Sequence, residues 1–185
     1  MIRMQQPSIS INSHDVPGPH YRMWKTIEAA EGTTASDVAR MIESMNISAL
    51  LKDDTPLRNI ILNCHGSPGG LSMGGSGKPQ IDKSNVGVFG TLGHYNVGTI
   101  WLVACRAALG TAGQDFCQTL AKVAKTTVIA SDDYQSVGAW GTWRITVAGL
   151  SGNIDEYEGT VYGFTGMGSI HRGIDPEDFV QTVLV

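Results

Sequence analysis

The chain has 185 residues, of which 42% are hydrophobic and 16% are charged, and its 13 basic and 17 acidic residues give a formal net charge of −4. This composition supports a hydrophobic core within one domain spanning residues 1–185, and it excludes a disordered chain. The mildly acidic balance argues against a nucleic-acid partner, and the longest apolar run, residues 99–105, is too short to cross a membrane.

The N-terminal segment predicts an extended lead-in over residues 1–20. Ile9 and Ile11 alternate with serines before Pro17 interrupts the pattern. The segment has no apolar stretch of the kind that a secretory signal needs. We therefore expect a protein that is cytoplasmic where it is synthesised, with export by a dedicated secretion system left open because that route needs no cleavable signal. Residues 21–31 fit a strand or a helix equally well.

A helix over residues 35–51 is predicted by its start signal and by its apolar face. Thr34 and Asp37 have the spacing of a capping box, in which each residue satisfies a backbone N–H of the other. The apolar stripe that follows recurs at helical spacing. It consists of Val38, Met41, Ile42 and Met45.

Three short apolar segments have the composition of buried parallel strands: residues 57–63, 99–104 and 126–130. A glycine-rich loop over residues 66–77 separates the first two, and a helix over residues 112–125 separates the last two. Strands that alternate with helices predict an α/β fold with a mostly parallel central sheet and helices on both faces.

The C-terminal part predicts an antiparallel edge to this sheet. Residues 143–149 and 159–164 have strand composition and flank a loop at 150–156, as the two arms of a hairpin do. Pro176 then opens a last short helix, because proline is well tolerated in a first helical turn.

Reactive side chains follow two of the predicted strands. His65 lies just beyond the strand at 57–63, and Cys105 comes directly after the strand at 99–104. Because the carboxyl ends of parallel strands meet at one edge of a sheet, we expect the two residues to lie about one strand spacing apart. Imidazole can take the thiol proton and so generate a nucleophilic thiolate. The backbone N–H groups of Gly66 and Cys105 are the expected oxyanion donors.

Two motifs carry a family resemblance. The segment His65-Gly66-Ser67-Pro68-Gly69-Gly70-Leu71 and the segment at 104–113, with its pattern Cys-x-x-Ala-x-Gly-x-x-Gly, resemble the histidine and cysteine motifs of the caspase-like (clan CD) cysteine peptidases, in a bacterial CHAT-like branch. The resemblance covers residues 57–138. It implies a three-layer caspase-like sandwich and a cysteine endopeptidase that uses His65 as base and Cys105 as nucleophile. It also implies a protein or peptide substrate and no cofactor or metal.

The chain departs from the caspase signature at two positions. Val103 stands where that signature has Gln, and Ala107 stands where it has Gly, so a preference for aspartate is not carried over. Members of the superfamily that prefer basic residues use an acidic pocket, and the resemblance makes Asp132 and Asp133 the candidates for it. A compact protease of this type would suit a bacterial effector or immune protease.

Two other functions stay open beside the peptidase. The fold can serve as a catalytically inactive interaction module, because fold alone does not fix function. The same Cys–His dyad can also serve an amidase or acyltransferase. Cys64 and Cys117 are expected to be core thiols, since Cys64 faces away from His65 along the strand and Cys117 lies on the apolar side of a helix.

Overall fold

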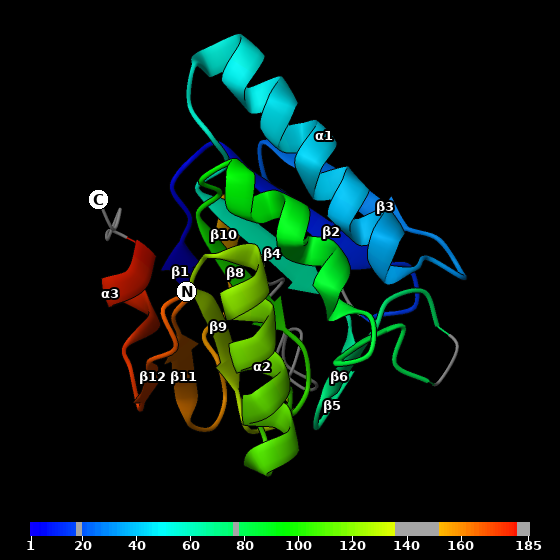
Figure 1. The fold of residues 1–185 in the computed structure, drawn as a ribbon, viewed down its shortest axis with the longest axis vertical. Coiled ribbons are helices and arrows are strands. Elements are labelled where there is room, and N and C mark those ends of the chain that lie inside the picture. The colour runs from blue at the N-terminus through cyan, green and yellow to red at the C-terminus, as the bar shows by residue number, and fades with distance from the viewer. Residues whose placement is uncertain (18–19, 76–77, 136–151, 181–185) are drawn as a thin grey trace, which may run out of the picture.

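A seven-stranded mixed sheet crosses the middle of the computed structural model, which describes residues 1–17, 20–75, 78–135 and 152–180 (Figure 1). From one edge to the other, its strands are β3 (Lys25–Ala29), β2 (Ser8–Ser13), β4 (Asn59–Asn63), β8 (Thr99–Val103), β9 (Val128–Ser131), β11 (Val161–Phe164) and β12 (Ile170–Arg172). The first five strands run parallel, and β11 and β12 are antiparallel to their neighbours.

The predicted mostly parallel sheet with an antiparallel edge is therefore confirmed. The apolar segments predicted as strands correspond to β4, β8 and β9, which are buried over their whole length. The edge itself is formed by the pairing of β9 with β11 and of β11 with β12. The other predicted arm of the hairpin, residues 143–149, lies outside the described residues.

The prediction of a lead-in over residues 1–20 is wrong for residues 8–13, which form a strand of the central sheet. Strand β2 lies inside the sheet between β3 and β4, and all its residues are buried. Its polar side chains are buried as well and have partners inside the protein. The Ser10 hydroxyl donates a hydrogen bond to the Tyr21 carbonyl oxygen at 2.6 Å, and Asn12 Nδ2 donates to the same oxygen at 3.0 Å. The ambiguous residues 21–31 contain strand β3.

Three helices cover one face of the sheet (Figure 1): α1 (Ala35–Asp53), the 3₁₀ helix η1 (Val86–His94) and α2 (Gly110–Ala124). The capping box of α1 is present, because the Thr34 hydroxyl accepts from the Asp37 N–H and the Asp37 carboxylate accepts from the Thr34 N–H. Helix η1 was not predicted, since three glycines break its pattern. No helix in the described part of the chain is long and apolar enough to span a membrane.

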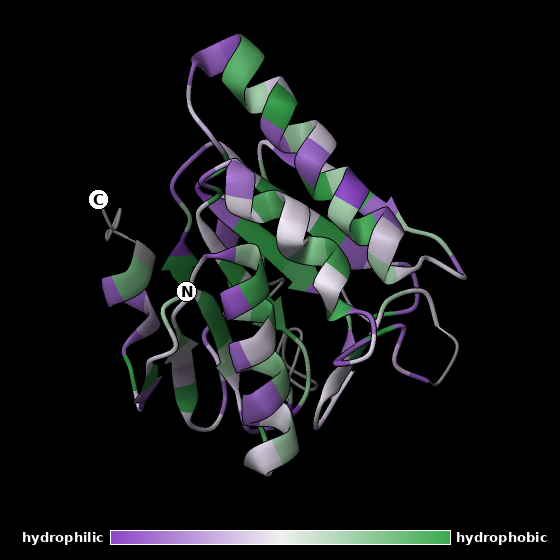
Figure 2. Cartoon of the chain, in the orientation of Figure 1, coloured by the Kyte–Doolittle hydropathy of each residue, from purple (hydrophilic) through white to green (hydrophobic). Residues whose placement is uncertain are grey.

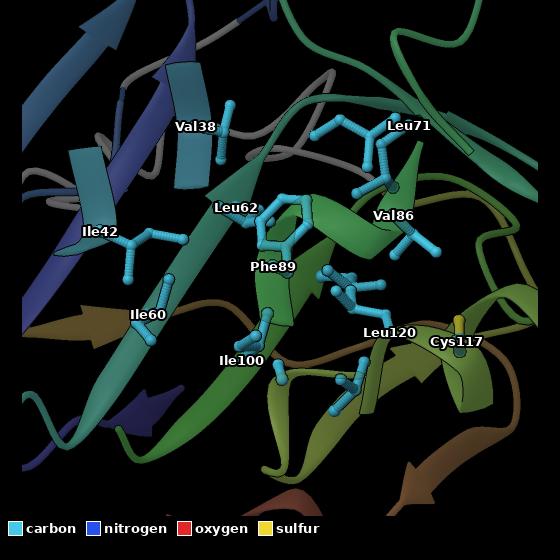
Figure 3. Packing of buried hydrophobic residues seen from close by; sticks show 14 of the residues in the cluster. Val38, Ile42, Ile60, Leu62, Leu71, Val86, Phe89, Ile100, Cys117 and Leu120 are labelled. Carbon is cyan, nitrogen blue, oxygen red and sulfur yellow. The ribbon is translucent and has the colours of Figure 1, made fainter. Parts of the chain in front are cut away.

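The main hydrophobic core lies between these helices and the sheet. Figure 2 shows apolar residues along the central strands. Helix η1 packs between α1 and α2, and Figure 3 shows its Phe89 side chain beside Leu62 of β4 and Ile100 of β8, all three of them fully buried. This packing holds β4 and β8 together along their length and so fixes the relative position of their carboxyl ends.

The opposite face of the sheet is covered differently. A two-stranded ribbon of β1 (Ile2–Arg3) and β10 (Asn153–Ile154) packs there with the short helix α3 (Pro176–Val180). Trp101 is at the centre of this second core, and its indole N–H donates to Asn59 Oδ1 at 2.9 Å. Helices thus lie on both faces, as expected, but among the described residues the second face has only the five-residue α3.

A small antiparallel sheet replaces most of the predicted glycine-rich loop at 66–77. It contains β5 (His65–Ser67), β6 (Gly70–Ser72) and β7 (Ile81–Asp82). Leu71 and Ile81 are fully buried and anchor it to the main core. Gly69 makes the turn between β5 and β6 with a φ of +92°, a conformation that suits glycine. This sheet begins at His65 and gives that residue a fixed backbone.

Candidate functional site

Three neighbouring strands, β2, β4 and β8, bring reactive residues to one edge of the sheet. Asn63, the last residue of β4, pairs with Asn12 of β2 on one side and with Val103 of β8 on the other. The alignment continues past the strand ends, because the Cys64 N–H donates to the Val103 carbonyl oxygen at 3.3 Å. The segments that carry Asp15, His65 and Cys105 therefore emerge side by side.

The backbone after His65 rests directly on the backbone at Cys105. A Cβ atom added to Gly66 would lie 2.5 Å from the Cys105 carbonyl oxygen and 2.9 Å from the Ala104 Cβ. These distances are too short for any side chain, so this contact requires glycine. The structure thus brings together the His65 and Cys105 segments that the sequence predicted to meet, and it places Gly66 between them.

Asp15 completes the arrangement, and the sequence analysis missed it. Its Oδ2 atom lies 3.4 Å from His65 Nε2. Its Oδ1 atom accepts a hydrogen bond from the Ser13 hydroxyl, whose oxygen in turn accepts from the Gly74 N–H at 2.8 Å. Asp15 is two residues beyond β2, so the signal for it was its place after a buried strand, which the lead-in interpretation of residues 1–20 concealed.

The electrostatics at Asp15 favour a carboxylate. Partial burial acts to raise its pKa, but the Ser13 hydroxyl, His65 and His14 act in the other direction, and the pKa is lowered from its ordinary value. The carboxylate therefore stays charged throughout the neutral range and becomes neutral only as the pH falls through this lowered pKa. Because this carboxylate pairs with His65 Nε2, Nδ1 is the ring nitrogen that faces away from it.

The Cys105 thiol is half-buried and lies against the backbone of Gln135. The Gln135 N–H donates to Cys105 Sγ at 3.4 Å, and the thiol donates to the Gln135 carbonyl oxygen at 3.7 Å. The next residue, Arg106, has a φ of +57°, and its N–H donates to the Asp133 carbonyl oxygen at 2.8 Å. Its guanidinium also stacks over the Tyr134 ring, with 4.2 Å to the ring centroid. These contacts hold the turn that presents the thiol.

The other two cysteines are core residues, as predicted. Cys64 and Cys117 are both buried, whereas Cys105 is partly accessible. Burial raises the pKa of both core thiols well above the ordinary value, and the charges of Asp15 and Cys105 act in the same direction on Cys64. Neither core thiol is suited to act as a nucleophile at neutral pH.

The residues expected to form an acidic pocket have other roles. Asp132 accepts hydrogen bonds from the Thr160 N–H at 2.8 Å and from the Tyr162 hydroxyl at 3.2 Å, so it ties the end of β9 to β11. The Asp133 carboxylate accepts from the Tyr134 N–H at 2.7 Å. The assignment of Asp132 and Asp133 to a substrate pocket stays a prediction.

No set of three or more His, Cys, Asp or Glu side chains is grouped to hold a metal ion within the described ranges. A family model described as a domain of unknown function (DUF4347) matches residues 31–159. This match includes His65 and Cys105 and leaves Asp15 outside. No curated protein and no solved structure matches the chain.

Proposed function

The chain belongs to the DUF4347 family, and we propose that it is a cysteine peptidase with a caspase-like fold. The observation that carries this proposal is the alignment of three strand ends, which brings the segments of Asp15, His65 and the partly accessible Cys105 side by side and pairs the imidazole with the carboxylate. The parallel sheet with a layer of helices and an antiparallel edge agrees with the fold that the two motifs imply. The proposed activity rests on the residues of the site.

His65 acts as the base through the nitrogen that does not face Asp15. Because Nε2 pairs with the Asp15 carboxylate, Nδ1 is left to take the proton from Cys105 Sγ. The sulfur attacks the carbonyl carbon of the scissile peptide and forms a C–S bond. His65 then gives its proton to the amide nitrogen, the C–N bond breaks and the amine product leaves.

Water completes the cycle by hydrolysing the thioester. His65 takes a proton from the water as the water oxygen attacks the thioester carbonyl carbon. The C–S bond breaks, the acid product leaves and the sulfur regains its proton from His65. The Gly66 and Cys105 N–H groups are proposed to donate to the oxyanion in both steps, since these two stretches of backbone are in contact.

Asp15 is a positioning residue in this scheme. Replacing it with asparagine is expected to lower kcat/KM by about 10- to 100-fold, because the neutral amide no longer stabilises the imidazolium. Asp15→Glu is expected to restore part of the loss. Steady-state cleavage of a peptide substrate between pH 5 and 8 measures both variants, with Asp53→Asn, at an exposed carboxylate at the end of α1, as the matched control. An unchanged kcat/KM in Asp15→Asn would remove Asp15 from the mechanism.

A panel of peptidyl electrophiles with different side chains before the reactive group tests the proposed activity directly. After incubation, mass mapping identifies the modified cysteine. We expect one adduct, on Cys105, whose rate of formation depends on the peptide sequence. Absence of an adduct, or similar modification of Cys64 and Cys117, supports an inactive interaction module instead. Modification that is insensitive to the peptide, without cleavage of any peptide, supports an amidase or acyltransferase.

A further inference from the structure

An amide–amide hydrogen bond joins the ends of β2 and β4, just before the residues Asp15 and His65. Asn12 and Asn63 are paired in the parallel register of the two strands, and Asn63 Nδ2 donates to Asn12 Oδ1 at 2.9 Å. Both side chains are buried, with exposed fractions of 0% for Asn12 and 1% for Asn63. Asp15 is three residues beyond Asn12 and His65 is two residues beyond Asn63, so this Asn12–Asn63 bridge sets the spacing from which both segments leave the sheet.

Asn12 also holds the other end of the segment that contains Asp15. Its Oδ1 accepts from the Tyr21 N–H at 3.1 Å, and its Nδ2 donates to the Tyr21 carbonyl oxygen at 3.0 Å. The chain that leaves β2 with Asp15 is therefore tied back to Asn12 when it reaches Tyr21. A single buried amide thus connects β2, the backbone at Tyr21 and, through Asn63, β4.

Asn63 is a costly residue for the stability of its surroundings. Its Oδ1 is buried and has no hydrogen-bond partner among the described residues. The adjacent side chains on this face of the sheet, Ile61 and Val103, are apolar, so a leucine would suit the position and would remove the unsatisfied oxygen. Asn12 Oδ1 would still accept from the Tyr21 N–H. Stability alone therefore does not explain an asparagine here.

We propose that the Asn12–Asn63 bridge is a positioning element that keeps the Asp15 carboxylate beside His65 Nε2. This inference rests on the proposed peptidase function and deepens it, because the bridge acts only through the Asp15–His65 pair. The 3.4 Å between Asp15 Oδ2 and His65 Nε2 is already longer than an ordinary N–H···O hydrogen bond. A further separation of the two strand ends would leave the pair unmade, and the imidazole would lose the contact that orients it.

Replacing Asn63 with leucine tests the bridge in a double-mutant cycle with Asp15→Ala. We expect Asn63→Leu to lower kcat/KM by about 10-fold, because a small displacement at a catalytic site has an effect of this order. The midpoint of urea denaturation is expected to stay close to that of wild type. In the Asp15→Ala background, Asn63→Leu is expected to change kcat/KM by less than about 2-fold, because the pair through which the bridge acts is already absent. A purely structural role would give the same loss in both backgrounds.

Asn59→Leu is the matched control from the other end of β4. Asn59 lies on the same face of the strand as Asn63, is 2% exposed and donates to the Ser8 hydroxyl of β2 at 3.1 Å. It also accepts from the indole N–H of Trp101 at 2.9 Å, and leucine would leave that buried N–H unpaired. We therefore expect the opposite result, a lower denaturation midpoint with a kcat/KM within about 2-fold of wild type.

The same comparison separates the bridge from the activity. An unchanged kcat/KM in Asn63→Leu, or equal losses with and without Asp15, overturns the bridge and leaves the peptidase standing. If wild type cleaves no peptide, the peptidase is overturned, and the rate of alkylation of Cys105 by iodoacetamide in the same proteins then decides the bridge: the same pattern supports it and equal rates overturn it. If Asn63→Leu does not fold, Asn63→Ala takes its place. Failure of both to fold overturns the proposal, because Asn63 would then be a requirement of the fold.

Discussion

Replacing Cys105 with alanine is expected to lower kcat/KM for peptide cleavage by about 10⁴-fold or more, because the variant has no atom that can form the acyl-enzyme. The fold is expected to persist, since Cys105 is only half-buried and, among the described residues, its side chain forms two weak hydrogen bonds, both to Gln135. Steady-state peptide cleavage measures the loss, and circular dichroism during thermal unfolding checks that the protein is folded.

Cys117→Ala is the matched control for this prediction. It also removes one thiol, but Cys117 is buried on α2 within the main core, where it donates to the Ala107 carbonyl oxygen at 3.5 Å. We expect it to lower the free energy of unfolding by about 1 kcal/mol and to keep its kcat/KM. Retention of activity in Cys105→Ala, or an equal loss in both variants, would show that Cys105 is not the nucleophile.

Replacing Gly66 with alanine is the second large effect that we expect. The new Cβ would lie 2.5 Å from the Cys105 carbonyl oxygen, and its next neighbour is the Ala104 Cβ, so no flexible side chain can move aside. The two backbone segments must separate, and a shift of about 1 Å at a catalytic site can cost about 100-fold in rate. We expect that loss of kcat/KM together with about 1–3 kcal/mol of lost stability.

The control for Gly66→Ala is Gly87→Ala in η1. A Cβ at Gly87 would meet no atom within 4 Å, and Gly87 does not have a positive φ. Chemical denaturation and peptide cleavage on both variants separate a general effect of adding a methyl group from the specific contact. If Gly66→Ala retains wild-type activity, the close approach of the two segments has no role in catalysis.

The sheet was predictable where a strand is a continuous apolar run. Strands β4, β8 and β9 have this pattern, and helix α1 has a capping box. Strand β2 was not recognised as part of the sheet, because its polar residues Ser10 and Asn12 are satisfied by the Tyr21 carbonyl oxygen, a contact that depends on the tertiary fold. Local glycines likewise concealed η1, whose stability comes from packing between α1 and α2.

The candidate site was predictable to the extent that it follows apolar strands. His65 and Cys105 follow β4 and β8, so their meeting could be inferred from parallel pairing. Asp15 could not be found without recognising β2 as a neighbour of β4. Asp132 was singled out from its place after β9, but its hydrogen bonds to the Thr160 N–H and the Tyr162 hydroxyl depend on the pairing of β9 with β11.

The central claim is that His65 activates the Cys105 thiol, and the rate of alkylation of Cys105 by iodoacetamide at pH 7 tests it most directly. Mass mapping follows each thiol in wild type and in His65→Ala, with the buried Cys64 and Cys117 as internal references. We predict that Cys105 reacts first in wild type and that its rate falls by about 10-fold or more in His65→Ala, because a thiol without a base forms less thiolate. An equal rate in the two proteins would contradict the proposed Cys–His pair.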